Sequence, residues 1–86
     1  MAARLVFLGR LEELAGCPFA DVAFGAPLHW ADVLAWLGDD QAPELPALVN
    51  SDKVRLALNG MMVTDKASLT VVDGDELAFL PPVSGG

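Results

Sequence analysis

The sequence predicts a two-layer α+β fold in which one main helix lies across a small mixed β-sheet. Three patterns lead to this prediction. An apolar stripe at helical spacing follows Pro27, short apolar runs stand near both ends of the chain, and an alternating strand at 54–58 precedes the hairpin signal Asn59-Gly60. The 86 residues suffice for one domain, and a hydrophobic content of 53% suffices for its core.

The first part of the chain predicts a hairpin interrupted by a short helix. Leu5–Leu8 is a continuous apolar run, which favours a central strand covered on both faces. Arg10–Ala15 is expected to form a helix that turns Leu11 and Leu14 inward and stops at the next glycine. Phe19–Phe24 is expected to return as a strand that pairs with the first.

The main helix is expected to begin at Pro27, because proline suits the first position of a helix. Gly38 is expected to end this helix, and Trp36 falls off its apolar stripe and should be half exposed. The stripe consists of Trp30, Val33, Leu34 and Leu37.

The second half of the chain predicts a loop followed by three strands. Residues 39–53 contain two prolines and should form a loop with one helical turn near 47–49. After the strand at 54–58 and its turn, residues 61–64 should form the return strand, and Leu69 should re-enter the core. Asp73-Gly74 then supplies a turn into Leu77–Leu80, a run short and apolar enough for a buried strand.

Composition excludes several classes of partner. A net charge of −7 makes nucleic acid and anionic membranes poor partners, and it suits a basic protein surface. The single cysteine, Cys17, has no basic neighbour to activate its thiol, so we expect a partly buried residue in a cytoplasmic protein. The N-terminal residues lack the pattern of a signal peptide or a transmembrane span.

Candidate catalytic groups are sparse. His29 has no second His or Cys at ligand spacing, so no metal site is expected, and the chain contains neither a GxGxxG nor a GxxxxGK phosphate loop. Asp73, Asp75 and Glu76 form an acidic cluster, but adjacent carboxylates on a turn are usually solvated turn formers, and no His or Arg accompanies them. A freestanding enzyme is therefore the weakest of the functions considered.

The final residues predict an arm that delivers a carboxyl group. Pro81-Pro82 cannot continue a central strand, because proline donates no N–H and fixes φ, so the chain must leave the sheet in extended form. Val83 and Ser84 follow, and Gly85-Gly86, which lacks Cβ atoms, can enter a narrow passage and present the terminal carboxylate to another protein. We expect a domain at 1–80 and a tail at 81–86, with a frayed terminus as the alternative.

Alternation along the last strand predicts a docking patch. If Phe79 lies under the helix, Leu80 faces the open side of the sheet, and the same alternation places either Phe7 or Leu8 on that side. Leu8, Met62 and Leu80 would then form an apolar patch at the root of the tail. The alternative is that a loop covers these residues or that they are ordinary scattered surface residues.

The run 73–86, with its Pro-Pro-Val-Ser-Gly-Gly ending, closely resembles the C-terminus of the small subunits of molybdopterin synthases, a family of ubiquitin-like β-grasp sulfur carriers. Leu11–Gly16 and Leu56–Gly60 match the same pattern, so the resemblance extends along most of the chain, and residues 39–52 are its least typical part. The thiazole-pathway carrier shares Gly-Gly but not the Pro-Pro-Val approach. The resemblance implies a β-grasp fold with the first and last strands as central neighbours.

The resemblance also implies sulfur chemistry at Gly86, with no catalysis and no bound cofactor in the chain itself. A ubiquitin-activating-type enzyme would use ATP and Mg²⁺ to adenylate the terminal carboxylate, and a sulfur donor would displace AMP to leave a thiocarboxylate. The large subunit of molybdopterin synthase would then admit the tail and transfer the sulfur to a pterin precursor in molybdenum cofactor biosynthesis.

Two alternatives stay open. A sulfur carrier of another pathway, or a ubiquitin-like modifier that forms isopeptide bonds through Gly86, would begin with the same tail chemistry. A β-grasp interaction module with an inert tail belongs to another class. Extending the tail by one residue separates the last from the others, because it abolishes function only if the free carboxyl group matters.

Overall fold

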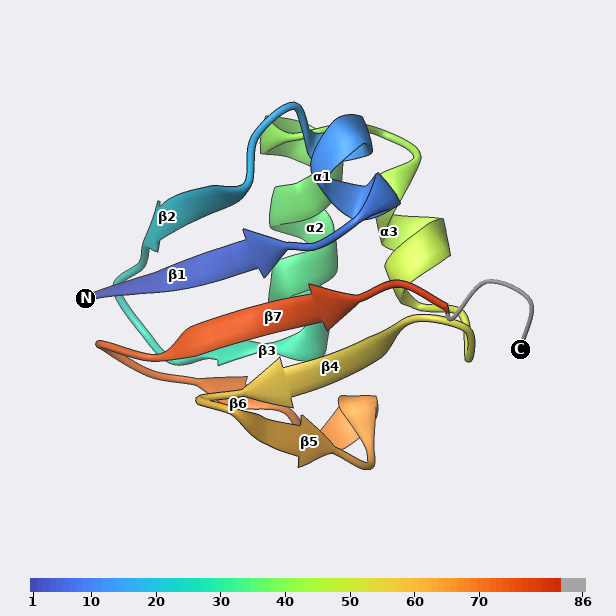
Figure 1. The fold of residues 1–86 in the computed structure, drawn as a ribbon. Helices are drawn as coiled ribbons and strands as arrows, with labels where there is room; N and C mark the ends of the chain where they lie inside the picture. Colours follow the sequence, from blue (N-terminus) through green and yellow to red (C-terminus); the bar gives the residue numbers. More distant parts are fainter. Residues whose placement is uncertain (83–86) are drawn as a thin grey trace.

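The computed structural model describes residues 1–82, which form a five-stranded mixed sheet with helix α2 (Trp30–Asp40) lying behind it in the view of Figure 1. The strand order is β2-β1-β7-β4-β5, and only β1 and β7 run parallel. The strands are β1 Ala2–Phe7, β2 Phe19–Ala23, β4 Arg55–Leu58, β5 Met61–Val63 and β7 Glu76–Leu80. The predicted α+β fold with a mixed sheet is confirmed.

Smaller elements close the ends of this sandwich. Helices α1 (Arg10–Ala15) and α3 (Leu45–Val49) pack together beyond the ends of β1 and β7, and a 3-10 turn, η1 (Lys66–Ser68), follows β5. A separate two-stranded sheet pairs β3 (Leu28–His29) with β6 (Thr70–Val71). The helical turn expected near 47–49 is confirmed as the last part of α3.

The core lies between α2 and the inner face of the sheet. The Phe7 and Phe79 rings stack with centroids 5.5 Å apart and planes 7° from parallel, a contact that adds about 1 kcal/mol beyond the area it buries. Leu69 is buried as expected. The other large side chains that sheet and helix contribute to the core are Leu5, Leu56, Leu77, Trp30, Val33 and Leu37.

Strand pairing confirms the arrangement that the family resemblance implies. Leu5 lies opposite Leu77 and Phe7 opposite Phe79, so the first and last strands are neighbours at the centre of the sheet. The hairpin between β4 and β5 is also confirmed. Asn59 and Gly60 have φ values of 51° and 84°, and a two-residue turn of the type that matches strand twist requires positive φ at both positions.

Two predictions about burial are wrong. The first strand is covered on one face only: Leu5 and Phe7 are buried, whereas Arg4 is exposed and Val6 half-buried, because α2 packs on one side of the sheet. Leu14 is 41% exposed although Leu11 beside it is buried. With only six residues, α1 turns a single side chain fully into the core.

The predicted bounds of the main helix are also wrong. The helix begins at Trp30 rather than Pro27, because Leu28 and His29 pair with Val71 and Thr70 as strand β3. It then continues through Gly38 to Asp40. The glycine permits close helix packing instead, since a methyl group at Gly38 would stand 3.1 Å from Cγ of Pro46, near the start of α3. The half-buried position of Trp36 agrees with the prediction.

Candidate functional site

The tail leaves the sheet where β7 ends. Beyond Leu80, Pro81 is half-buried and Pro82 is exposed, and neither belongs to a strand. The remaining predicted tail residues, Val83, Ser84, Gly85 and Gly86, lie outside the described residues. The structure therefore shows the root of the tail.

The tail root borders an apolar hollow. Pro81 and Pro82 line a cavity of about 560 Å³ together with side chains from α1, α3 and the residue that precedes β4. Those side chains are mainly apolar: Leu11, Leu14, Leu48 and Val54, with Arg10 at the border. Since proline donates no backbone hydrogen bond, this packing is what supports the chain as it departs from the sheet.

The three residues of the predicted docking patch all keep solvent-accessible surface. Leu8 is 39% and Met62 is 52% exposed, and Leu80 is half-buried. Continuing the β1–β7 register past Phe7 and Phe79 places Leu8 beside Leu80. Met62 lies farther away, because Arg55 is the partner of Leu80 on β4 and separates it from β5. A docking role for these residues stays a prediction.

An apolar row that sequence reasoning missed crosses the whole open face. Residues paired in register point to the same side of a sheet, and successive pairs join one row across the five strands. The row consists of Phe19, Val6, Ala78, Ala57 and Met62. Alternation in β1, β2 and β4 carried the signal, but it becomes visible only once the strand order is known. The open face thus presents a continuous apolar line that ends in two exposed side chains.

A charged pair borders this row at the β2 edge. The Arg4 guanidinium lies 4.1 Å from the centroid of the Phe19 ring and donates to the Asp21 carboxylate, with Nε and Oδ1 2.9 Å apart. The hydrogen bond and the opposite charge lower the pKa of Asp21 and raise the pKa of Arg4. Arg4 therefore holds the Phe19 ring in a defined position on the open face.

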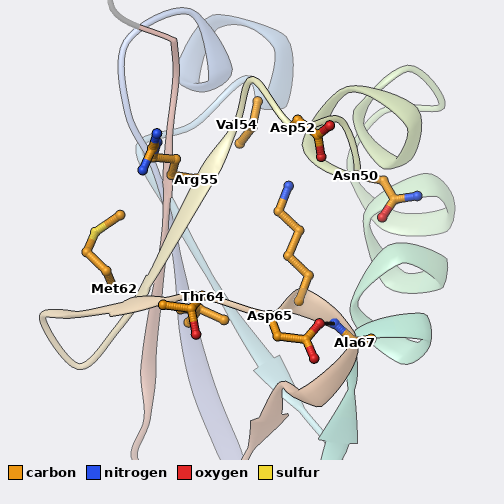
Figure 2. Close-up of a pocket in the computed structure, with 10 residues that line it drawn as sticks. Asn50, Asp52, Val54, Arg55, Met62, Thr64, Asp65 and Ala67 are labelled. Carbon is orange, nitrogen blue, oxygen red and sulfur yellow. Dashed lines mark hydrogen bonds between the residues drawn. The ribbon is translucent and has the colours of Figure 1, made fainter.

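A second hollow lies beside β5. It measures about 570 Å³, and Figure 2 shows Asn50, Asp52, Arg55, Met62 and Asp65 around it. Two of its charged groups, Lys66 and Asp65, are engaged in structural contacts. Nζ of Lys66 donates to the Val49 and Ser51 carbonyls, each at 2.7 Å, and burial lowers the pKa of this lysine. Asp65 accepts from the Ala67 N–H at the start of η1. The contacts tie η1 to the end of α3.

The acidic cluster is used to connect strand ends. Asp73 accepts from the N–H of Ala2 at 2.8 Å, and Asp75 accepts from the N–H of Val72 at 2.8 Å and from the Asn59 side chain at 2.9 Å. These groups lie at the end of β7 opposite the tail root. Their position makes them structural rather than catalytic for the tail.

His29, the remaining polar candidate, is the N-cap residue of α2, and its side chain is exposed. Its backbone N–H donates to the Asp32 carboxylate at 2.9 Å, which caps the helix. Within residues 1–82, no three His, Cys, Asp or Glu side chains gather closely enough to hold a metal ion. No helix in this part of the chain is long and apolar enough to cross a membrane.

Comparison with known proteins supports a carrier rather than an enzyme. A model of the ThiS family matches residues 5–86. The molybdopterin synthase sulfur carrier subunit of Escherichia coli is 31% identical over 83 residues, which cover 96% of this chain and 98% of that protein.

Solved structures show the same fold. The crystal structure of the small archaeal modifier protein 1 of Haloferax volcanii matches with a TM-score of 0.77 and 26% identity over the full length of both chains. A complex of subunits 1 and 2 of the molybdopterin-converting factor from Helicobacter pylori contains a chain that matches with a TM-score of 0.64 and 20% identity, again over both full lengths.

Proposed function

The chain belongs to the ThiS family of sulfur carriers, and from that premise we propose that it is the sulfur-carrying small subunit of a molybdopterin synthase, working through the carboxyl group of Gly86. The observation that carries the choice of pathway is the similarity to the Escherichia coli carrier subunit, which extends over nearly the whole of both chains. The chain acts as a carrier and not as an enzyme.

The proposed chemistry separates activation from delivery. A carboxylate is a poor electrophile, so a partner enzyme that uses ATP and Mg²⁺ first forms an acyl adenylate at Gly86 and releases pyrophosphate. A sulfide-equivalent donor then attacks the acyl carbon, the bond to AMP breaks, and a thiocarboxylate remains. In the large synthase subunit, this sulfur attacks a carbon of the pterin precursor and displaces an oxygen leaving group, and water then cleaves the acyl–sulfur bond to return Gly86 to its carboxylate. The chain supplies the carboxyl group, the reach of residues 81–86 and the docking surface.

The described residues suit this division of labour. The tail root departs from a rigid central strand, whose Leu77 and Phe79 are fully buried. The open face beside it carries Leu8, Leu80 and the apolar row that ends in Met62, a surface for partner docking. The related Helicobacter pylori chain was solved in complex with a second subunit. We assign the same kind of partner here, together with the activating enzyme, in a cytoplasmic setting.

A protein modifier is the second candidate. The similarity to the Haloferax volcanii modifier protein, at 26% identity over both full lengths, supports it. In this case the activated Gly86 carbonyl would form an isopeptide bond with a lysine of another protein. Both candidates share the activation step and differ in the acceptor.

The test of the carrier function is intact mass. The full chain is incubated with its activating enzyme, ATP and a sulfur donor, beside two controls: a chain without Gly86 and a chain extended by one residue. A mass gain equal to one oxygen replaced by sulfur, seen only in the full chain, supports the proposal. No gain in the presence of an activating enzyme that is shown to be active on another carrier would leave an interaction module with an inert tail.

A further inference from the structure

Two glycines flank the short helix α1, and their surroundings differ. Gly9 and Gly16 both have positive φ, at 56° and 80°. Among residues 1–82, and apart from its chain neighbours, a methyl group built on Gly16 has no atom within 4 Å, whereas one built on Gly9 stands 3.0 Å from Cγ and 3.9 Å from Cβ of Pro81. A contact of 3.0 Å is tighter than carbon atoms normally make, so a side chain at Gly9 would push the Pro81 ring from its present position by a few tenths of an ångström.

The parallel pairing explains this meeting. Phe7 lies opposite Phe79, and two residues farther along both strands stand Gly9 and Pro81. Here the two strands diverge: β1 leads into α1, and β7 leads into the tail. Gly9 has ψ of −129° with its positive φ, a combination open to glycine and strained for other residues.

The sheet itself cannot fix the direction of the tail at this point. Pro81 has no N–H to donate, so it cannot extend the ladder of hydrogen bonds between β7 and β1. The orientation of the Pro81 ring therefore depends on packing against Gly9 and against the hollow lined by Leu11, Leu48 and Val54.

We propose that Gly9 is a positioning residue for the C-terminal tail, because its missing side chain creates the seat in which the Pro81 ring rests. That seat sets the direction in which the tail leaves the domain and meets the active site of a partner. The inference rests on the proposed function. It adds a residue that lies far from Gly86 in sequence and makes no contact with a reacting atom.

The experiment compares Gly9→Ala with Gly16→Ala. Both variants place an alanine at positive φ beside α1, so both should lower Tm by roughly 5–15 °C, and Gly9→Ala should lower it more because its ψ of −129° lies outside the left-handed region. The mass assay for sulfur loading is then run at a temperature where both remain folded. Gly9→Ala should lower kcat by on the order of 10- to 100-fold, as expected for a misplaced reacting group, with KM unchanged because the open face is intact. Gly16→Ala should react like the wild type.

Removing the obstructing atom provides the second readout. Pro81→Ala deletes Cγ, so the further loss caused by Gly9→Ala should be several-fold smaller in the Pro81→Ala background than in the wild type. In case Gly9→Ala does not fold, Pro81→Ala is compared with Pro82→Ala, since only Pro81 comes within 4 Å of the methyl position at Gly9. Pro81→Ala should then show the larger loss in kcat.

The possible results distinguish the positioning role of Gly9 from the sulfur-carrier function on which it rests. If the wild type gains sulfur but Gly9→Ala and Gly16→Ala load at the same rate, or Pro81→Ala and Pro82→Ala do so, the positioning role is wrong and the carrier function stands. If the wild type gains no sulfur with an active enzyme, the carrier function is wrong and the positioning role falls with it.

Discussion

At the scale of single residues, the two stacked rings at the centre of the sheet show how much one buried side chain contributes to the stability of the fold. Phe79 is fully buried against Phe7, between the only two parallel strands of the described sheet. Phe19, of the same type, is 45% exposed on the edge strand. Comparing Phe79 with Phe19 tests the effect of burial for the same type of side chain.

Phe79→Ala should lower the free energy of unfolding by about 3–5 kcal/mol, because it removes a buried ring and leaves a cavity. Phe19→Ala, the matched control, should change it by less than about 1 kcal/mol. Urea unfolding followed by circular dichroism measures both values. Equal losses for the two variants would contradict the assigned strand order.

Asp21 provides a prediction for pH. Its hydrogen bond with Arg4 lowers the pKa of Asp21 below the ordinary 3.8. The carboxylate therefore contributes stability that is fully present above pH 3.8 and is lost as the pH falls through the lowered pKa of the folded state.

The stability difference between the wild type and Asp21→Asn should accordingly shrink below that pH. It should also shrink in high salt, since both partners are exposed. Urea midpoints at neutral and acidic pH give the comparison. A difference that grows on acidification would show that the ion pair is absent in solution.

At the scale of elements, Lys66 joins parts of the chain that backbone hydrogen bonds leave separate. Its ammonium donates to the Val49 and Ser51 carbonyls at the end of α3 and lies 5.8 Å from the Trp30 ring. Helix C-terminal carbonyls lack partners within their own helix, so this lysine satisfies groups that would otherwise depend on water.

Lys66→Met should destabilise the fold by about 1–3 kcal/mol, because it removes two charge-assisted hydrogen bonds to partly buried carbonyl groups. Lys53→Met is the control, because Lys53 is exposed and its substitution removes the same charge. Thermal unfolding of both variants separates the two effects. Similar Tm values would mean that the Lys66 contacts contribute nothing measurable.

Sequence reasoning located most elements but placed some of their bounds incorrectly. Asn59-Gly60 predicted the hairpin correctly, because the turn requires positive φ at two adjacent residues and few residue types adopt it readily. The start of α2 depended instead on a partner strand at Thr70–Val71, about forty residues away, so Pro27 gave a misleading local signal. Likewise, the burial of Leu5–Leu8 could not be judged without knowing that one face of the sheet has no helix over it.

At the scale of the whole molecule, helix α2 and the core cover one face of the sheet, and the other face is open. The tail root and the open face adjoin each other. Leu80 ends the strand from which the tail departs, and the apolar row crosses the five strands next to it. The candidate site could be predicted in part. Leu8 and Leu80 follow from alternation, whereas the row through Ala78 and Ala57 requires the strand order.

Docking through the open face predicts a selective loss of affinity. Met62→Glu should weaken binding to the activating enzyme or the large subunit by about tenfold or more, because it places a charge in the apolar row. Val72→Glu is the control: Val72 is 44% exposed but stands outside the row. Calorimetric titration of each variant measures the affinities, and equal weakening would place the interface elsewhere.

The proposed function requires Gly86 to deliver sulfur to a pterin precursor. The most direct test is a single turnover with the thiocarboxylated chain, the large synthase subunit and that precursor. The account predicts that the chain returns to its carboxylate mass while the pterin gains sulfur, with no transfer when the large subunit is omitted. Retention of sulfur on the chain, or its appearance as lysine conjugates through Gly86 with other proteins, would contradict the account and identify the chain as a modifier.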